Sequence, residues 1–181
     1  MIMTVFGSSS VKENTDGYKE IIELGKALGK KSISIVSGGY AGSMEAISKG
    51  AKQENANTIG ITCTSLELLF PEKKPNNFIN NEIKTETIDK RIENMIKLAD
   101  FFTILPGSSG TQLEWITAYE KMNSGFISEK PIIFYKADTR IKNFVQYLCE
   151  QRRNKKHLFY FANNIQEYGQ IVNRIKNYSR K

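Results

Sequence analysis

The stretch Pro106-Gly-Ser-Ser-Gly-Thr-Gln-Leu-Glu114 decides the fold, because it follows the apolar, strand-like run 101–105 and opens a helix-like one. A glycine-rich turn between a strand and a helix forms a cradle for phosphate. Its glycines let the backbone approach an anion closely, and its serine and threonine hydroxyls add donors beside the free N–H groups of the helix start. We therefore expect phosphate at residues 107–111, with Glu114 at the rim of the cradle.

A capping box is the alternative interpretation of this stretch. In that case Thr111 caps the helix and Glu114, three residues later, returns the hydrogen bond. Two further glycine turns favour the phosphate cradle: Ser37-Gly-Gly-Tyr-Ala-Gly-Ser43 follows the strand-like run 32–36, and Gly7-Ser-Ser-Ser10 follows residues 3–6. Turns at the carboxyl ends of parallel strands meet at one sheet edge and build a nucleotide site there. None of them is the G-x-G-x-x-G fingerprint or a Walker loop.

Strand-like and helix-like runs alternate along the chain, which predicts an α/β fold with a Rossmann-like, doubly wound parallel sheet. We expect residues 1–181 to form a single domain. The segment 64–81, which contains two prolines, is expected to be irregular and either covers a site or serves as a flexible connector. The expected strands are 3–6, 32–36, 58–62, 101–105, 131–135 and 158–161, and the expected helices are 17–29, 42–54, 83–98, 110–124, 141–152 and 165–178.

The composition favours a small anionic ligand and a cytoplasmic protein. The net charge of +7 includes basic clusters at 152–156 and 174–181, which suit an anion but support a nucleic-acid surface only weakly. Cys63 and Cys149 are far apart in apolar contexts and are expected to be reduced, buried thiols. The start of the chain is strand-like rather than a signal peptide, and no run approaches the ~20 apolar residues of a membrane span.

Carboxylates and cations must supply the chemistry, because His157 is the only histidine. Its position in a basic stretch near the end of the chain argues against a Ser-His-Asp triad and a histidine-based metal site, so no metal is expected. Glu114 and Arg91 are the best-placed candidates. Arg91 shares a helix face with Met95 and Leu98, which turns it toward packed structure, where it forms either a structural ion pair or an anion clamp.

The stretch 106–114 resembles the P-G-G-x-G-T-x-x-E signature of the LONELY GUY (LOG) family, cytokinin riboside 5′-monophosphate phosphoribohydrolases often mislabelled lysine decarboxylases. The similarity extends over most of the chain. Gly7-Ser-Ser9 matches the first strand turn of the family, residues 38–44 match its G-G-G-x-x-G-L-M turn, and Arg91 matches the arginine of its M-x-x-R-K motif. The resemblance implies that Arg91 and Glu114 are catalytic. It also implies a substrate-binding and phosphate-binding set: Gly7, Ser8, Gly38, Gly39, Gly42, Ser43, Glu72, Gly107, Ser108, Ser109, Gly110 and Thr111.

The chain departs from the family pattern at several positions, but not at Arg91 and Glu114. The departures therefore bear on the substrate more than on the reaction. Glu72 is matched through a loop that does not align closely. The replaced positions are Ser43 for leucine, Ile88 for methionine, Ile92 for lysine, Ser108 for glycine and Leu113 for a frequently acidic residue.

These features lead to the hypothesis of N-glycosidic hydrolysis of a purine or cytokinin nucleoside 5′-monophosphate such as AMP, giving free base and ribose 5-phosphate. Cleavage builds positive charge on the sugar, which the Glu114 carboxylate stabilises while it aligns or deprotonates water. Arg91 offsets negative charge on either the phosphate or the leaving base. No cofactor is needed.

Three other functions are alternatives to hydrolysis. A noncatalytic carrier on the same fold, resembling the molybdenum cofactor carrier proteins, would bind a phosphate-bearing cofactor without cleaving it. A nucleic-acid-binding module is disfavoured because the chain has no interleaved aromatic and basic motif. A pyridoxal-phosphate decarboxylase is disfavoured because no lysine of the chain lies in a Schiff-base context. The resemblance also implies a homodimer in which each partner completes the site of the other.

Overall fold

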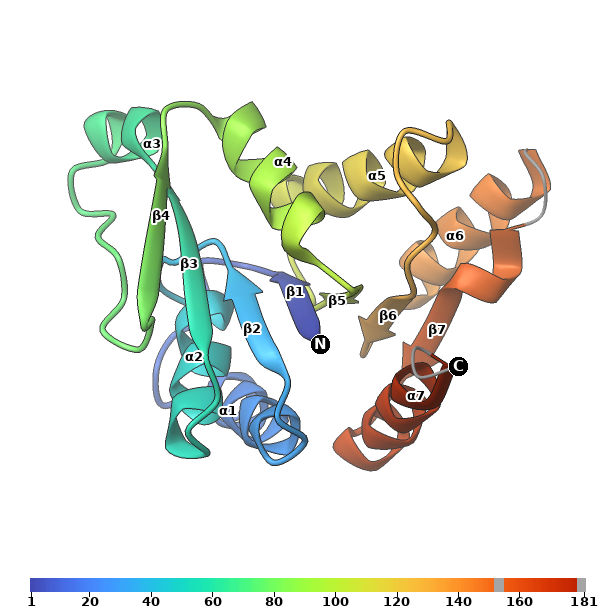
Figure 1. Cartoon of the computed structure of the whole chain (residues 1–181), viewed down its shortest axis with the longest axis horizontal. Coiled ribbons are helices and arrows are strands. Elements are labelled where there is room, and N and C mark those ends of the chain that lie inside the picture. Colours follow the sequence, from blue (N-terminus) through green and yellow to red (C-terminus); the bar gives the residue numbers. More distant parts are fainter. Residues whose placement is uncertain (152–154, 179–181) are drawn as a thin grey trace.

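The structure is a computed structural model that describes residues 1–151 and 155–178, and this part of the chain forms an α/β fold on one parallel sheet (Figure 1). The predicted fold class, a Rossmann-like doubly wound sheet, is confirmed. The strands are β1 (Ile2–Phe6), β2 (Ser34–Ser37), β3 (Thr58–Cys63), β4 (Asn81–Thr85), β5 (Phe101–Ile104), β6 (Ile132–Tyr135) and β7 (Phe159–Ala162). The helices are α1 (Asp16–Gly29), α2 (Ser43–Gln53), α3 (Thr64–Leu69), α4 (Ile88–Leu98), α5 (Ser109–Asn123), α6 (Thr139–Gln151), the short 3-10 helix η1 (Lys155–Leu158) and α7 (Ile165–Tyr178).

The strand order contains a reversal that positions the site. The order is β4-β3-β2-β1-β5-β6-β7, and each neighbouring pair is parallel. From β1 the chain winds outward to β4 and then crosses back to β5, on the other side of β1. The pairing runs from Met3 with Phe101 to Phe6 with Ile104. The turns that leave β1 and β5 therefore diverge at a topological switch point, the place where such sheets bind ligands.

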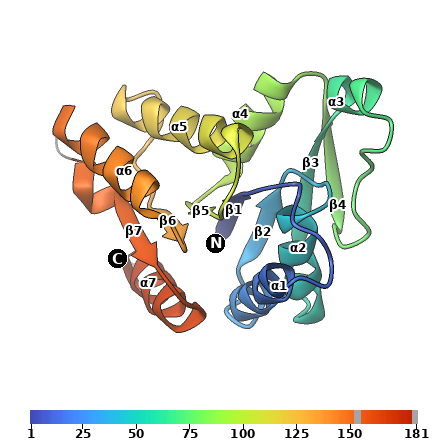
Figure 2. The same cartoon turned by 180° about the vertical axis from the view of Figure 1, so that it is seen from behind.

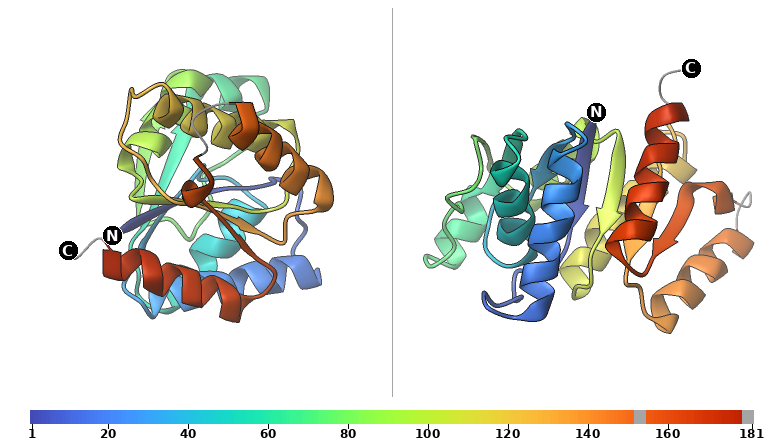
Figure 3. Two further views of the ribbon diagram at one scale, coloured as in Figure 1. Left: turned by 90° about the vertical axis from the view of Figure 1, so that its right-hand side faces the viewer. Right: turned by 90° about the horizontal axis from the view of Figure 1, so that it is seen from below.

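Helices cover both faces of the sheet. Figures 1 and 2 show α1, α2 and α7 over one face and α4, α5 and α6 over the other, and the right-hand view of Figure 3 looks onto the first group. Successive side chains of a strand point to opposite faces of the sheet, so the core has two parts. Phe101 packs in the part on the α1 side, and Phe102 packs in the part on the α4 and α5 side. Both side chains are fully buried, and burying each contributes about 1.5–3 kcal/mol.

The prediction of one helix over 83–98 is wrong in its first part. Residues 81–85 form the edge strand β4, which pairs with β3 from Asn81 opposite Ile59 to Thr85 opposite Cys63. The helix α4 begins only after Thr87, whose hydroxyl accepts from the Lys90 N–H at 3.3 Å. Glutamate and lysine in this segment are good helix formers, but pairing with the exposed edge of β3 overrides that preference.

The segment 64–81 is also more ordered than expected. It begins with α3 and ends in β4, and its middle is held on the β2–α2 turn by Asn76. The Asn76 backbone N–H donates to the Gly39 carbonyl at 2.8 Å, and its side-chain amide donates to the Gly39 and Tyr40 carbonyls at 3.0 Å each. Three bonds from one residue argue against a flexible connector here.

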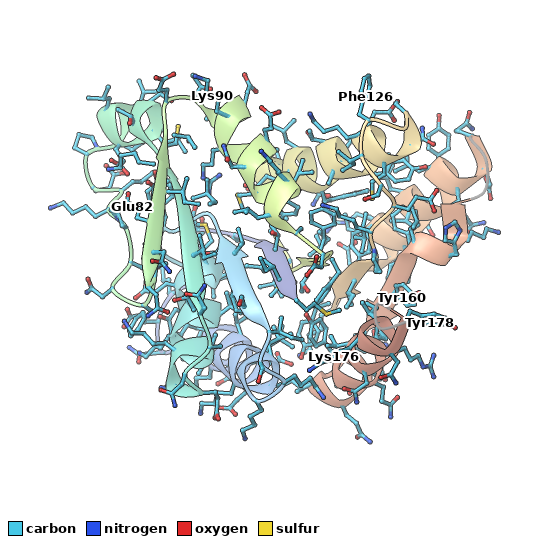
Figure 4. The ribbon with its side chains drawn as sticks, viewed as in Figure 1. Glu82, Lys90, Phe126, Tyr160, Lys176 and Tyr178 are labelled. Carbon is cyan, nitrogen blue, oxygen red and sulfur yellow. The ribbon has the colours of Figure 1, made fainter. Side chains whose placement is uncertain are left out.

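The remaining expected elements agree with the structure within a few residues, and both thiols behave as predicted. Cys63 and Cys149 are free and buried. Figure 4 shows side chains filling both faces of the sheet, with Lys90 and Phe126 projecting on the α4 and α5 side and Lys176 on the α7 side. Parts of the two basic clusters, residues 152–154 and 179–181, lie outside the described residues, as does Arg152, the expected end of the helix predicted over 141–152.

Candidate functional site

The β5–α5 turn presents an open helix start at the switch point. The N-cap residue Ser108 makes no side-chain cap bond, and the first turn of α5 holds no acidic residue. Ser108, Ser109 and Gly110 are exposed. A Cβ at Gly107 would lie 2.1 Å from Thr111 Oγ1, so only glycine permits this tight turn. Free N–H groups and the positive end of the helix dipole thus face solvent, which is the arrangement that binds an anion.

The capping-box alternative is wrong, because α5 begins three residues earlier than that motif requires. Ser108 occupies the N-cap, so Thr111 is already the third helical residue and is buried. Glu114 is well inside the helix, and its carboxylate bonds to a side chain of α4 rather than to the start of its own helix. The signature is therefore not explained by helix capping.

Glu114 and Arg91 form a buried ion pair. Arg91 Nη1 donates to Glu114 Oε1 at 3.1 Å, and the two side chains are only 7% and 13% exposed. Arg91 Nε also donates to the Ile61 carbonyl of β3 at 2.8 Å. The guanidinium is thus fixed from two elements, and the two residues that the family resemblance marks as catalytic are in direct contact.

The β2–α2 turn supplies the surroundings of this guanidinium. A Cβ at Gly38 would lie 1.5 Å from Arg91 Nη2, so the glycine leaves the space that the arginine fills. The Arg91 guanidinium carbon lies 5.6 Å from the centre of the Tyr40 ring, and Nη2 lies 3.7 Å from Met44 Sδ. A cation over an aromatic face is favourable. Gly38 therefore makes room for the Arg91 guanidinium.

Burial raises the pKa of Glu114 above its ordinary value, and the charge and hydrogen bond of Arg91 offset part of that rise. Burial removes water from around a carboxyl group and so disfavours its charged form. A raised pKa brings a carboxylate closer to the range in which it acts as a general base near neutral pH. This carboxyl group is thus suited to proton transfer.

The β1 and β2 turns pack against each other beneath the site. Gly42 has a φ of +74°, in the left-handed region, and a Cβ there would lie 2.6 Å from the Ser8 carbonyl oxygen. The same carbonyl accepts from the Ser43 N–H at 2.9 Å. Gly7 is equally close, because its Cβ would lie 3.0 Å from Ser43 Cβ. The structure brings these predicted residues together, and their contact with substrate stays a prediction.

Three predicted residues, Ser43, Gly39 and Glu72, have surroundings that differ from those of the rest. Ser43 is buried, and its hydroxyl has no hydrogen-bond partner among the described residues. Gly39 has a φ of +76°, and its carbonyl is occupied by Asn76. Glu72 is exposed in the loop after α3, and no hydrogen bond or ion pair joins it to Arg91 or Glu114 in the described part of the chain.

Two features of the site were not predicted from the sequence: Tyr40, and a cavity on the flank of the β5–α5 turn that faces away from the ion pair. Tyr40 stacks on Arg91, and its hydroxyl accepts from the Cys63 N–H at 2.7 Å and donates to Glu67 at 3.2 Å. Its position between the glycines of the second turn was the available signal. On the opposite flank of α5 lies a cavity of about 520 Å³, which depends on residues of β6 and α6 that carry no motif.

Neither a metal cluster nor a membrane helix is found in residues 1–151 and 155–178. No group of three histidine, cysteine or acidic side chains that could hold a metal ion occurs there. No helix in the same ranges has the length and apolar character needed to cross a membrane. His157 is exposed and lies 2.8 Å from Glu129, away from the residues of the ion pair.

The chain is similar to known proteins in sequence and in fold. The family model described as LDcluster4, SLOG cluster4 family, matches residues 1–168. The pyrimidine/purine nucleotide 5′-monophosphate nucleosidase of Escherichia coli K12 is 31% identical over 120 residues, which cover 62% of this chain and 25% of that protein. The chain thus spans about a quarter of the length of the curated relatives it matches.

Solved structures show the same fold at lower identity. The molybdenum cofactor carrier protein of Chlamydomonas reinhardtii has a TM-score of 0.77 at 19% identity, covering 97% of this chain and 98% of the other. The molybdenum cofactor binding protein of Rippkaea orientalis has a TM-score of 0.76 at 20% identity, covering 96% of both chains. At such identities the likeness establishes the fold alone.

Proposed function

Because the chain belongs to the SLOG cluster4 family, we propose that it hydrolyses the N-glycosidic bond of a nucleoside 5′-monophosphate to a free base and ribose 5-phosphate. The match supports the LOG-like superfamily that the motifs indicate, and not specifically its cytokinin-producing members. The similarity to a nucleotide 5′-monophosphate nucleosidase supports the reaction class. A purine nucleotide such as AMP, or a cytokinin nucleotide, is the substrate that we propose, within one nucleotide-binding unit of residues 1–181.

The buried ion pair beside an open anion-binding turn carries this proposal. Glu114 Oε1 is held by Arg91 at 3.1 Å, which orients the carboxylate and leaves Oε2 to face the sugar or a water molecule. As the glycosidic bond breaks, the carboxylate stabilises the positive charge that develops on the sugar and takes a proton from the attacking water. Arg91, permanently charged, offsets negative charge on the phosphate or the departing base.

The turn 107–111 should bind the 5′-phosphate, so AMP should be cleaved far better than adenosine. Ser109→Glu tests this placement, because Ser109 is exposed at the first position of α5. A carboxylate there is favourable for the helix by about 0.3–1 kcal/mol, yet it repels phosphate. We expect unchanged or slightly higher thermal stability together with a loss of AMP binding, measured by calorimetry. Equal turnover of nucleoside and nucleotide by the wild type would contradict the placement.

Ionisation of Glu114 should raise the activity and lower the stability of the protein as the pH rises. Hydrolysis requires the carboxylate, so kcat/KM should rise as the pH rises through the raised pKa of Glu114. The folded protein binds this proton more tightly than the unfolded chain does, so the contribution of Glu114 to the free energy of unfolding falls over the same window. Paired pH profiles of kcat/KM and urea unfolding measure both. An acid limb of activity at the pH of an exposed glutamate would contradict this assignment.

We also propose a homodimer, in agreement with the resemblance that the sequence shows. Large apolar side chains are exposed on the helices of the α4 and α5 side: Leu113 of α5 is 54% exposed and Phe126, just beyond α5, is 80% exposed. We propose that both side chains are covered in the contact between the two subunits. Sedimentation at micromolar concentration should show a dimer, and the double variant Leu113→Asp with Phe126→Asp should be monomeric. A wild-type protein that sediments only at 20.6 kDa would reject the dimer.

The second candidate function is that of a noncatalytic carrier, which binds a nucleotide or another phosphate-bearing cofactor without cleaving it. The observation that favours it is the direct ion pair between Glu114 and Arg91, as in a purely structural pair. Such a carrier would bind nucleotide at the same turn and release no base. Binding of AMP without release of adenine would therefore favour the carrier over the hydrolase.

A further inference from the structure

A second binding region lies on the flank of the β5–α5 turn opposite the ion pair. Gln112 lines a cavity of about 520 Å³, whereas Glu114 contacts Arg91. Residues two apart on a helix point about 200° away from each other, so the cavity and the ion pair occupy opposite sides of the α5 start. The exposed residues Ser108 and Ser109 also line the cavity. A phosphate bound at the turn would therefore lie between the ion pair and the cavity.

The far wall of this cavity carries two cations, and both side chains keep donors for a ligand. Arg140 Nε and Nη2 donate to one oxygen of Asp138 at 2.9 and 2.6 Å, which leaves Nη1. Lys136 Nζ uses one of its donors on Glu20 at 2.6 Å. The other Asp138 oxygen accepts from the Ile141 N–H at 3.0 Å. Both oxygens of Asp138, the acidic residue of the lining, are thus occupied.

The backbone at Lys136 is in a costly conformation that positions this wall. Its φ is +53°, in the left-handed region that residues with a Cβ rarely adopt. The Lys136 N–H donates to the Ala162 carbonyl of β7 at 2.7 Å, and Tyr135 donates to Glu20 at 2.6 Å. Backbone strain of this kind concentrates at ligand-binding positions. The surrounding bonds hold the lysine at the rim of the cavity.

Apolar side chains, among them Ile104, Phe134 and Ile141, also line the cavity. The Arg140 side chain is 91% exposed and the Lys136 side chain is 46% exposed, so both cations lie on the solvent side of the cavity, where a ligand can reach them and salt screens their charge. The volume lies within the range of pockets that hold small ligands. The cavity thus combines space, cations and a partly apolar wall directly beside the phosphate turn.

We propose that this cavity binds a second phosphate, so that the ligands of this protein include nucleotides carrying a 5′-diphosphate. The proposal rests on the proposed function in one respect, the placement of the first phosphate at residues 107–111. The base and ribose then extend toward Arg91 and Glu114, and the second phosphate extends toward Arg140 and Lys136. Arg140 is the specificity-determining residue, because its free Nη1 supplies a charge-assisted hydrogen bond that a monophosphate does not reach.

Titration calorimetry with AMP and ADP at 0.15 M salt tests the proposal, with each protein also carrying Glu114→Gln so that nucleotide is not consumed. ADP should bind about tenfold more tightly than AMP, as expected for one added charge-assisted contact. Arg140→Ala should bring the ratio of the two Kd values close to one. Arg174→Ala, which removes an exposed charge on α7, is the matched control and should leave the ratio unchanged.

Two results would overturn the proposal: equal Kd values for AMP and ADP before Arg140 is replaced, or an equal loss of affinity for both nucleotides in Arg140→Ala. Failure of the proposed function looks different. If ADP shows the Arg140-dependent advantage while the wild-type protein releases no base, the second phosphate site stands and hydrolysis fails. If adenine is released from AMP but ADP binds no more tightly, the cavity proposal alone fails.

Discussion

Glu114→Gln should lower kcat by about 10²-fold or more, because it removes the charge that stabilises the developing cation on the sugar. Glutamine keeps the volume of the side chain and can still accept from Arg91 Nη1. It leaves the Arg91 charge without its counter-ion in a site where the two side chains are 7% and 13% exposed. We expect a loss of about 1–3 kcal/mol in the free energy of unfolding, which leaves the protein folded at 25 °C given the usual stability of about 5–15 kcal/mol.

Steady-state release of base, with unfolding measured in parallel, separates catalysis from stability. Glu120→Gln is the matched control, since Glu120 is an exposed residue of the same helix and its replacement should leave kcat near the wild-type value. Wild-type turnover by a folded Glu114→Gln variant would reduce Glu114 to a structural partner of Arg91.

Arg91→Ala should lower kcat/KM by about 10²-fold or more and should also destabilise the protein. The variant loses the bonds to Ile61 and Glu114, and breaking a buried pair by removing one partner costs about 3–5 kcal/mol. It also removes the influence that lowers the pKa of Glu114, so the acid limb of the activity profile should move to higher pH. Activity per folded molecule, determined beside the melting temperature, measures the two effects separately.

Two companion variants sharpen the test of Arg91. Arg91→Lys keeps the charge but lacks the forked guanidinium that reaches Ile61 and Glu114 together, so it should recover part of the stability and little of the activity. Lys90→Ala removes an exposed charge from the neighbouring position of α4 (Figure 4) and should change neither. A folded Arg91→Ala variant with full activity per molecule would make the residue purely structural.

The fold was predictable from the sequence because its local and global signals agree. Glycine turns after β-branched runs mark the carboxyl ends of β1, β2 and β5, and the alternation of strands and helices fixes a parallel sheet. The miss at β4 has a physical cause: an edge strand with four exposed residues carries little apolar alternation, so its polar residues read as part of the helix that follows. Only pairing with β3 identifies it.

The residues of the candidate site that belong to a sequence motif could be predicted. Those that only the folded chain brings together could not. The motifs indicated Arg91 and Glu114, but spacing could not show that they touch. The substrate contact expected of Gly38 stays a prediction, and spacing could not show that this glycine makes room for Arg91. Lys136 and Arg140 follow a strand with no glycine signature, and only the position of β6 beside β5 brings them to the turn.

The most direct measurement of the central claim is incubation of the wild-type protein with a panel of nucleoside 5′-monophosphates, AMP and a cytokinin nucleotide among them. Free base and ribose 5-phosphate are quantified together. We expect both products in equal amounts from at least one nucleotide, with release abolished or strongly reduced in Glu114→Gln. Binding of AMP without release of base from any nucleotide in the panel would contradict hydrolysis and leave the protein as a carrier.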